Sequence, residues 1–212
     1  QSGAIIRLSK EQIGPASEML VEAFFNDAKL TYVLPDDTTR REEGRNIFAF
    51  HLRYGLNYGR VYATSPTLEG VAVWLPSDRS EVTFWRAMRS GGMALQNGLS
   101  KDAMKRLLAF AEEVDVYHKK HLPRSHCYLF FIGVDPRLHG KGYGGKLIRP
   151  MLDWMDRKQV ACYLNTQNEK NIGLYEHFGF SVVEPVSLPG SGILHTGMIR
   201  NPAVQGEKSR LA

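Results

Sequence analysis

The feature that most constrains this sequence is an almost wholly apolar run over residues 127–134 that leads into a glycine-rich segment. Such a run predicts a strand buried on both faces, in the interior of a sheet. Residues 139–146 contain four glycines and two lysines and precede a helical pattern. Glycine amides can approach a ligand closely, and a helix N-terminus carries partial positive charge. This segment therefore predicts a binding site for a phosphate or pyrophosphate group.

The rest of the chain alternates strand-like and helix-like patterns, which predicts one α/β unit. Apolar spacing predicts helices over residues 9–24, 38–56, 100–121, 144–159 and 168–178. Alternating or continuous apolar residues predict strands over residues 4–8, 60–65, 70–75, 127–134, 160–164, 180–186 and 195–200. Residues 26–37 have the composition of a loop, and residues 76–99 show no clear pattern. We expect a single domain over residues 4–201 and a flexible tail over residues 202–212.

Composition narrows the classes of partner. The net charge of +5 suits an anionic ligand, but the basic residues do not form the concentrated face that nucleic acid requires. No apolar run approaches the roughly 20 residues that cross a bilayer. Cys127 and Cys162 lie in apolar runs without the spacing of a metal site, so we expect two buried thiols. We expect a cytoplasmic monomer or homodimer that binds neither nucleic acid, membrane nor metal.

Two nucleotide-binding patterns fit the glycine segment only in part. Gly140, Gly142 and Gly145 match G-x-G-x-x-G, but the loop does not follow its strand directly. The position 20 residues beyond Gly145 is Asn165 rather than an acidic residue. A P-loop would require Ser or Thr where this chain has Leu147. A dinucleotide site and a nucleotide hydrolase are both disfavoured.

A pair of motifs favours a third interpretation. Residues 134–144 (VDPRLHGKGYG) resemble motif A, Q/R-x-x-G-x-G/A, of the GCN5-related N-acetyltransferase (GNAT) superfamily, with His139 at the usual Gln or Arg position. Residues 171–180 (NIGLYEHFGF) resemble the second motif of that family, about 30 residues further on and beyond a predicted strand. Residues 70–76 and the residues that lead into the second motif resemble the puromycin N-acetyltransferase branch.

The resemblance implies a mixed, centrally splayed sheet flanked by helices, and transfer of an acetyl group from acetyl-CoA to an amine. In this family the strand before the loop binds pantetheine, and the loop amides bind pyrophosphate. The positions of this chain that match are Ile132, Gly133, Val134, His139, Gly140, Lys141, Gly142, Tyr143, Gly144, Gly145, Asn171 and Tyr175. Amides near Ile132 and Val134 are expected to polarise the thioester carbonyl. Tyr175 is expected to be the general acid for the leaving thiolate.

The sequence does not identify the general base. Puromycin-type relatives are expected to have a glutamate where this chain has Asn165, and a neutral amide cannot take a proton. His126 and Tyr128, at the start of the predicted central strand, are possible replacements, since a histidine titrates near neutral pH. Asp27 and Glu69 are weaker candidates, and a water relay to a backbone carbonyl would also serve.

The acceptor pocket is expected in the N-terminal half of the chain. Its candidate walls are aromatic: Phe24, Phe25, Tyr32, Phe48, Trp74 and Trp85. They favour a small, somewhat apolar amine as the acceptor. Two alternatives remain: acetylation of a protein N-terminus or lysine, and a non-catalytic module that senses acyl-CoA.

Overall fold

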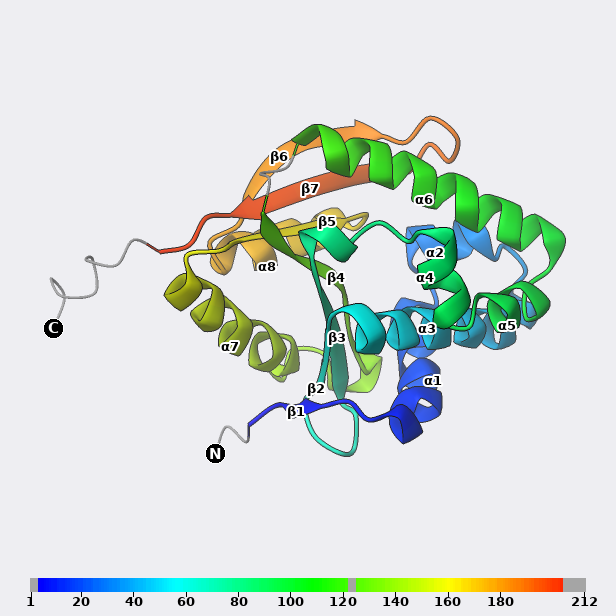
Figure 1. Ribbon diagram of the computed structural model, residues 1–212, viewed down its shortest axis with the longest axis horizontal. Helices are drawn as coiled ribbons and strands as arrows, with labels where there is room; N and C mark the ends of the chain where they lie inside the picture. The colour runs from blue at the N-terminus through cyan, green and yellow to red at the C-terminus, as the bar shows by residue number, and fades with distance from the viewer. Residues whose placement is uncertain (1–3, 122–124, 204–212) are drawn as a thin grey trace, which may run out of the picture.

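The computed structural model describes residues 4–121 and 125–203, and their strands form one mixed sheet (Figure 1). The order across this sheet is β1-β2-β3-β4-β5-β7-β6. The strands are β1 (Ile6–Arg7), β2 (Arg60–Ala63), β3 (Gly70–Pro76), β4 (His126–Val134), β5 (Ala161–Thr166), β6 (Ser181–Ser187) and β7 (Leu194–Arg200). Among the described pairs, β4 and β5 are parallel and the others are antiparallel. The α/β fold class expected from the sequence is confirmed.

Helices cover both faces of the sheet. They are α1 (Ile13–Phe24), α2 (Ala28–Val33), α3 (Asp37–Tyr58), α4 (Phe84–Arg89), α5 (Gly92–Asn97), α6 (Lys101–His121), α7 (Tyr143–Lys158) and α8 (Ile172–His177). Figure 1 shows α7 and α8 on one side and α1 and α3 on the other. Leu20 and Leu52 belong to the core on the α1 and α3 side, whereas Leu147 and Met155 belong to the core beneath α7. Each core buries one face of the central strands.

The predicted strands and the long helices are confirmed, with small shifts at their ends. The interpretation of residues 26–37 as a loop is wrong, because α2 lies within them. Asp27 caps this helix: its Oδ1 accepts hydrogen bonds from the amides of Lys29 at 3.0 Å and Leu30 at 3.4 Å. A helix of six residues is too short to show a helical period. The predicted tail, residues 202–212, lies outside the described residues except for 202 and 203.

The two central parallel strands, β4 and β5, stop pairing about halfway along β4. Pairing between β4 and β5 covers Leu129 with Leu164 and goes no further along β4. Opposite β3, Trp74 pairs with Leu129 and Val73 pairs with Phe131, so Phe130 is the extra residue of a β-bulge. Beyond the bulge β4 is paired with β3 on one edge only. Burial on both faces, expected for this strand, holds for residues 126–129 but not for 130–132, which border the opening.

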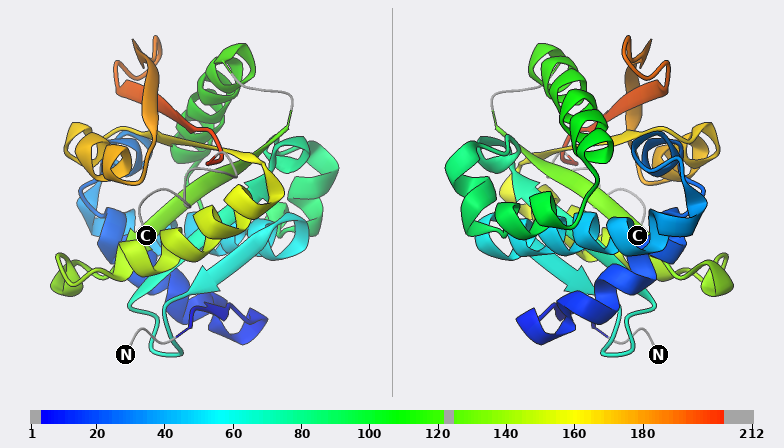
Figure 2. Two further views of the ribbon diagram at one scale, coloured as in Figure 1. Left: turned by 90° about the vertical axis from the view of Figure 1, so that its left-hand side faces the viewer. Right: turned by 90° about the vertical axis from the view of Figure 1, so that its right-hand side faces the viewer.

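The β6–β7 hairpin stands beside α6 at one end of the molecule (Figure 2). The amide of Gly190 in the hairpin turn donates to Glu113 Oε1 of α6 at 2.8 Å. The Tyr117 hydroxyl of α6 donates to the Glu184 carbonyl of β6. These contacts fix α6 next to the separated ends of β4 and β5. In the described part of the chain, no helix combines the length and apolar character that a bilayer span requires.

Candidate active site

The opening between β4 and β5 leads into a cavity of about 720 Å³. Its walls come from both strands and from α1, α2, α3, α6 and α8. Ile132 of β4, Asn171 at the N-terminal end of α8 and Tyr175 of α8 all border this cavity. Two parts of the sequence that carry the predicted motifs are therefore brought together at one place. The separation of the strands makes that meeting possible.

The glycine loop, which follows β4, has a backbone conformation that suits an anion. Gly140 and Gly142 have φ angles of +78° and +81°, a conformation that side-chain-bearing residues rarely adopt. Gly142 also caps the N-terminus of α7. Within the part of the chain that the structure describes, the amides of Gly140, Gly142, Tyr143, Gly144 and Gly145 donate to no backbone carbonyl. Several free amides at a helix N-terminus match the oxygen atoms of a pyrophosphate.

Two side chains of this loop bind other parts of the protein. His139 Nε2 lies 3.1 Å from the carbonyl oxygen of Val134, so this imidazole closes the loop rather than extending from it. Counted back three residues from Gly140, the Gln/Arg position of motif A is Arg137, so its assignment to His139 is wrong. Arg137 is bound to the carboxylate of Asp135 at 2.6 Å. The backbone amides, with the side chain of the exposed Lys141, are the donors that remain for a phosphate group.

Tyr175 lies at the inner end of the opening, and its side chain is only 7% exposed. Burial raises the pKa of its phenol to about 12, so the hydroxyl keeps its proton at neutral pH. No residue in the described ranges hydrogen-bonds to this hydroxyl. A protonated, uncommitted phenol beside the strand opening is suited to donate a proton to a leaving thiolate.

Asn165 and Tyr128 meet where the two strands begin to separate. Asn165 Nδ2 donates to the Tyr128 hydroxyl, and Asn165 Oδ1 accepts from Gln167 Nε2 at 3.1 Å. Both functional groups of the amide are therefore engaged. Burial raises the pKa of Tyr128 well above its ordinary range, so this phenol is not a base at neutral pH. We interpret Asn165 as a group that positions Tyr128.

His126 does not border the cavity and is buried behind it. Its Nε2 lies 3.1 Å from His118 Nε2, and the His118 ring stacks on Tyr163 with the ring centroids 4.9 Å apart. Burial lowers the pKa of His118 to about 4, so this cavity-lining imidazole is neutral. The structure thus gives the histidine at the start of β4 a partner in the core. Its role as a base stays a prediction.

The two weaker base candidates have different surroundings. Glu69 accepts hydrogen bonds from the hydroxyls of Ser65, Thr64 and Thr67, each at 2.7 Å, which lower its pKa to about 2. It lies in the β2–β3 turn, outside the cavity. Asp27 borders the cavity, and burial raises the pKa of its carboxyl group. Only Asp27 of this pair is placed to reach an acceptor.

Some, but not all, of the residues predicted to form the acceptor wall line the cavity. Phe24 and Phe48 line the cavity, joined by Phe50, Phe110, Phe130 and Phe131. Phe25 and Tyr32 do not line it; the Phe25 ring packs against the guanidinium of Arg41 at 4.4 Å. Trp74 lies in the core beneath α7, on the other face of the sheet. Trp85 is 75% exposed on α4, outside the cavity.

Two cavity residues were not singled out from the sequence. Lys29 extends from α2, inside the segment that reads as a loop. His51 comes from α3, where it follows Phe48 by three residues and so shares the apolar face of that helix. Burial lowers the pKa of His51 well below its ordinary value, and the positive charge of Lys29 lowers it further. The signal that could have identified His51 from the sequence was a histidine on the apolar face of a predicted helix.

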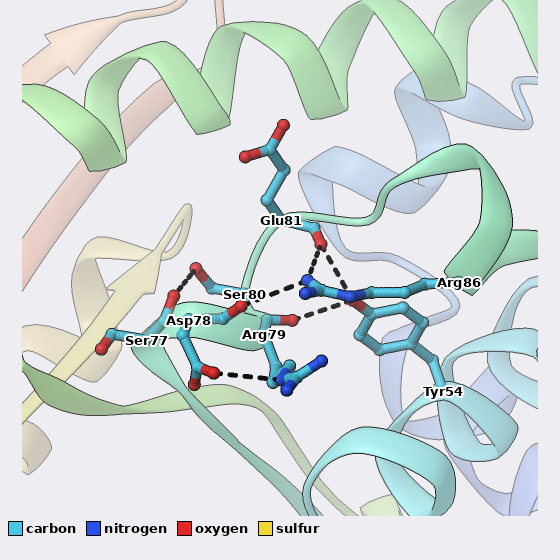
Figure 3. Close-up of polar contacts among 7 residues, drawn as sticks. All are labelled: Tyr54, Ser77, Asp78, Arg79, Ser80, Glu81 and Arg86. Atoms are coloured by element: carbon cyan, nitrogen blue, oxygen red, sulfur yellow. Dashed lines mark hydrogen bonds and ion pairs between the residues drawn. The ribbon is translucent and has the colours of Figure 1, made fainter.

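The segment after β3 forms the outer rim of the cavity (Figure 3). The Tyr54 hydroxyl lies 2.9 Å from the carbonyl oxygens of both Arg79 and Glu81. Arg86 Nη1 donates to the carbonyls of Asp78 and Glu81, each at 3.2 Å. Figure 3 shows the Glu81 carboxylate turned away from this cluster toward α6, where Lys119 binds it at 3.2 Å. The rim is therefore held by its backbone carbonyls.

Neither cysteine has a role at this site. Cys127 and Cys162 are register partners on β4 and β5, and both are buried, free thiols as expected. Burial raises the pKa of Cys127 to about 12 and that of Cys162 well above its ordinary value, so neither is a ready thiolate. In the described ranges no three His, Cys, Asp or Glu side chains are grouped as metal ligands.

The fold is that of an acetyltransferase. Residues 71–180, about half of the chain, match the family model described as the acetyltransferase (GNAT) family. The chain therefore belongs to this family and is an acyltransferase enzyme. It is 25% identical over 217 aligned residues to a Schizosaccharomyces pombe protein named as an uncharacterized N-acetyltransferase, covering 97% of this chain and 86% of that protein.

Solved structures share the same fold. A Corynebacterium glutamicum protein, named histone acetyltransferase HPA2 and related acetyltransferase, superposes with a TM-score of 0.65 at 18% identity, covering 97% of this chain and 99% of that one. The ribosomal-protein-S18-alanine N-acetyltransferase of Escherichia coli superposes with a TM-score of 0.52 at 16% identity, over 96% of each chain. Identities this low establish the fold and leave the acceptor open.

Proposed function

We propose that this chain transfers the acetyl group of acetyl-CoA to a primary amine of a small molecule, by direct attack of the amine within a ternary complex. The observation that carries this proposal is that the opening between β4 and β5, Asn171, Tyr175 and the aromatic wall border one cavity. At about 720 Å³, the cavity has the size of small-molecule sites.

The chain has the groups that acetyl-CoA requires. The free amides of Gly140 and of residues 142–145 would bind the pyrophosphate, and the unpaired edge of β4 with Asn171 would bind the pantetheine arm. Bound acetyl-CoA supplies the acetyl group as a thioester, which an amine nitrogen can attack. Amides around Ile132 and Val134 would donate to the carbonyl oxygen as negative charge develops on it.

In this proposal two side chains move protons. As the new C–N bond forms and the C–S bond breaks, the Tyr175 phenol would give its proton to the departing thiolate sulfur. The attacking nitrogen must lose a proton, and the neutral imidazole of His51 in the cavity wall would accept it. A base with a lowered pKa suffices here, because an amine bonded to the carbonyl carbon is far more acidic than a free ammonium ion.

An exposed apolar rim favours a second candidate, a peptide N-terminus as the acceptor. Phe84 is 68% and Leu108 62% exposed, and both line the cavity mouth. Such a rim is large enough to contact an apolar peptide. The resemblance to the puromycin N-acetyltransferase branch points instead to a small molecule and stays a prediction.

The test is release of free CoA thiol, followed over a panel that contains puromycin, arylalkylamines, amino acids and peptides with a free N-terminus. We expect turnover with small amines and calorimetric binding of CoA. Acetylation restricted to peptides would support the second candidate instead. CoA binding without acetylation of any amine would indicate a sensing module.

One variant tests whether His51 acts as the base or only as part of the cavity wall. His51→Gln keeps a polar side chain of similar size but cannot accept a proton. We expect a lower kcat with an unchanged Kd for CoA. A kcat equal to that of the parent would exclude His51 as the base.

A further inference from the structure

The cavity contains a cation, Lys29, that has no ion-pair contact in the described part of the chain, although the negative charge of Asp27 acts on it. Lys29 lies in the cavity wall, and its Nζ is 5.6 Å from the centroid of the Phe110 ring. Its ammonium group forms no ion pair or hydrogen bond with any residue of the described ranges. The nearby Asp27 uses Oδ1 to cap α2 rather than to bind this ammonium. A half-buried charge without a partner is unfavourable, which indicates that an anion completes the site.

A second buried donor lies near Lys29. Gln167 Nε2 is 3.0 Å from His195 Nδ1, and because an amide nitrogen can only donate, Nδ1 is the acceptor. The proton of this imidazole is therefore on Nε2, which is buried and has no hydrogen-bond partner. Burial, together with the positive charge of Lys29, lowers the pKa of His195 to about 4, but His195 is not among the residues that line the cavity.

Tyr128 is a donor in the cavity wall itself. Its oxygen already accepts from Asn165 Nδ2, so its own hydrogen is free to be donated. Tyr128 lines the cavity, and among the residues with described positions no acceptor takes this hydrogen. Lys29 and Tyr128 thus provide donors in the cavity wall without matching acceptors.

Four acidic residues line the cavity, and none forms an ion pair with Lys29 in the described ranges. Asp115 and Glu81 are both bound by Lys119, at 2.7 Å and 3.2 Å, Glu112 is exposed on α6, and Asp27 acts on Lys29 only through its charge. The Phe110 ring lies against Lys29, and Phe24 and Phe48 also line the cavity. An apolar wall with an unpaired cation is complementary to an apolar molecule that carries a carboxylate.

We infer that the acceptor is an apolar or aromatic amino acid, or a closely related amino carboxylate, whose carboxylate binds the Lys29 ammonium. This inference rests on the proposed function, because it places the amine of the same molecule at the thioester. The carboxylate would receive a hydrogen bond from Lys29. The Tyr128 hydroxyl is a neutral donor in the same cavity wall. The bound carboxylate would also favour the charged form of the lysine.

The first experiment measures binding and does not depend on catalysis. Calorimetry on the full chain, with and without CoA, compares matched acid and alcohol pairs: 3-phenylpropanoate with 3-phenylpropan-1-ol, and 4-methylpentanoate with 4-methylpentan-1-ol. In at least one pair we expect the acid to bind about tenfold or more tightly, as hydrogen bonds to charged groups imply. Equal affinities within both pairs, or no binding of either acid at millimolar concentration, would overturn the inference.

Variants of Lys29 test whether this residue causes the preference for the acid over the alcohol. Lys29→Met retains the length of the side chain and should abolish the preference for the acid, whereas Lys29→Arg should keep it. Lys105→Met removes an exposed lysine from α6 and is the matched control. Thermal unfolding checks that each variant is folded. A preference that survives in Lys29→Met would show that another group binds the carboxylate, and would also overturn the inference.

The second experiment measures acetyl transfer to phenylalanine and to phenethylamine, which differ by the carboxylate alone. We expect a higher kcat/KM for phenylalanine in the parent and loss of that ratio in Lys29→Met. Better turnover of phenethylamine would reject the amino carboxylate and leave the proposed function standing. Failure to bind CoA would reject the proposed function, while the binding comparison would still report on Lys29.

Discussion

The hydroxyl of Tyr128 accepts a hydrogen bond from the side-chain amide of Asn165 where β4 and β5 separate. Asn165 is one residue beyond Leu164, the last residue of β5 that pairs with β4. An amide at this position directs the phenol, whereas the glutamate expected in puromycin-type relatives could take a proton. A base on another element is therefore expected, and His51 of α3 borders the same cavity.

Replacement of Tyr175 by Phe tests the general acid. Tyr175→Phe removes the hydroxyl from a buried ring that packs edge-on against Phe180, so the fold should be retained. General acids contribute about 100-fold or more to turnover, and kcat should fall by that amount while the Kd for CoA stays the same. Steady-state thiol release and calorimetry measure the two quantities.

Tyr62→Phe, in β2 and outside the cavity and the glycine loop, is the control for loss of a tyrosine hydroxyl. It should keep full kcat. A Tyr175→Phe enzyme as fast as the parent would remove Tyr175 from its role as the acid.

A methyl group at Gly142 should weaken CoA binding. The φ angle of this residue is +81°, and a left-handed conformation costs a residue with a Cβ about 1–2 kcal/mol. Gly142→Ala should therefore distort the loop and raise the Kd for CoA about tenfold. Gly14→Ala is the matched control, since Gly14 lies in α1 and a Cβ there has no atom within 4 Å. Equal Kd values for both variants would contradict the role of the loop.

The sequence signals for the CoA side of the candidate site are local. Positive-φ glycines, a helix start and an apolar strand lie within about 30 residues of one another, so Gly140 and Gly142 could be recognised without a structure. The acceptor side depends on tertiary packing. In β3 both faces are buried, so alternation alone could not show that Trp74 points toward α7. Lys29 reaches the cavity only because α2 packs beside α6.

Buried neutral histidines should make stability depend on pH. Burial lowers the pKa of His118 and of His195 from the ordinary value of 6.5 to about 4. Between pH 6.5 and 4 the unfolded chain binds more protons than the folded chain. The free energy of unfolding is therefore full above pH 6.5 and falls as the pH drops toward 4. Each such histidine contributes a slope of up to about 1.4 kcal/mol per pH unit.

Urea unfolding at several pH values measures this slope. His118→Gln should flatten it, whatever the variant does to stability at pH 7.5. His177→Gln removes an exposed histidine from α8 and should leave the slope unchanged. An identical slope for the parent and His118→Gln would show that His118 is not held neutral by the fold.

The last prediction concerns the ion pair that joins β7 to α7. Arg200 binds Asp156 through two contacts, Nη1 to Oδ1 at 2.7 Å and Nη2 to Oδ2 at 2.8 Å, and the two side chains are 13% and 15% exposed. Arg200 Nε also donates to the Phe178 carbonyl at 3.1 Å, which ties down the C-terminal end of α8. Arg200→Met removes the donor to the Asp156 carboxylate and to the Phe178 carbonyl. The free energy of unfolding should fall by about 2 kcal/mol, less than for a fully buried pair.

A double-mutant cycle isolates this pair from other effects. Asp156→Asn should cost less in the Arg200→Met background than alone, because the carboxylate has already lost its partner there. Arg157→Met, an exposed neighbour on α7, should change the free energy of unfolding by a few tenths of a kcal/mol at most, about the value of a surface substitution. Additive losses in the cycle would mean that the two side chains stabilise the fold independently. A coupled pair would instead link the end of β7 to α7, whose N-terminus forms the proposed pyrophosphate site.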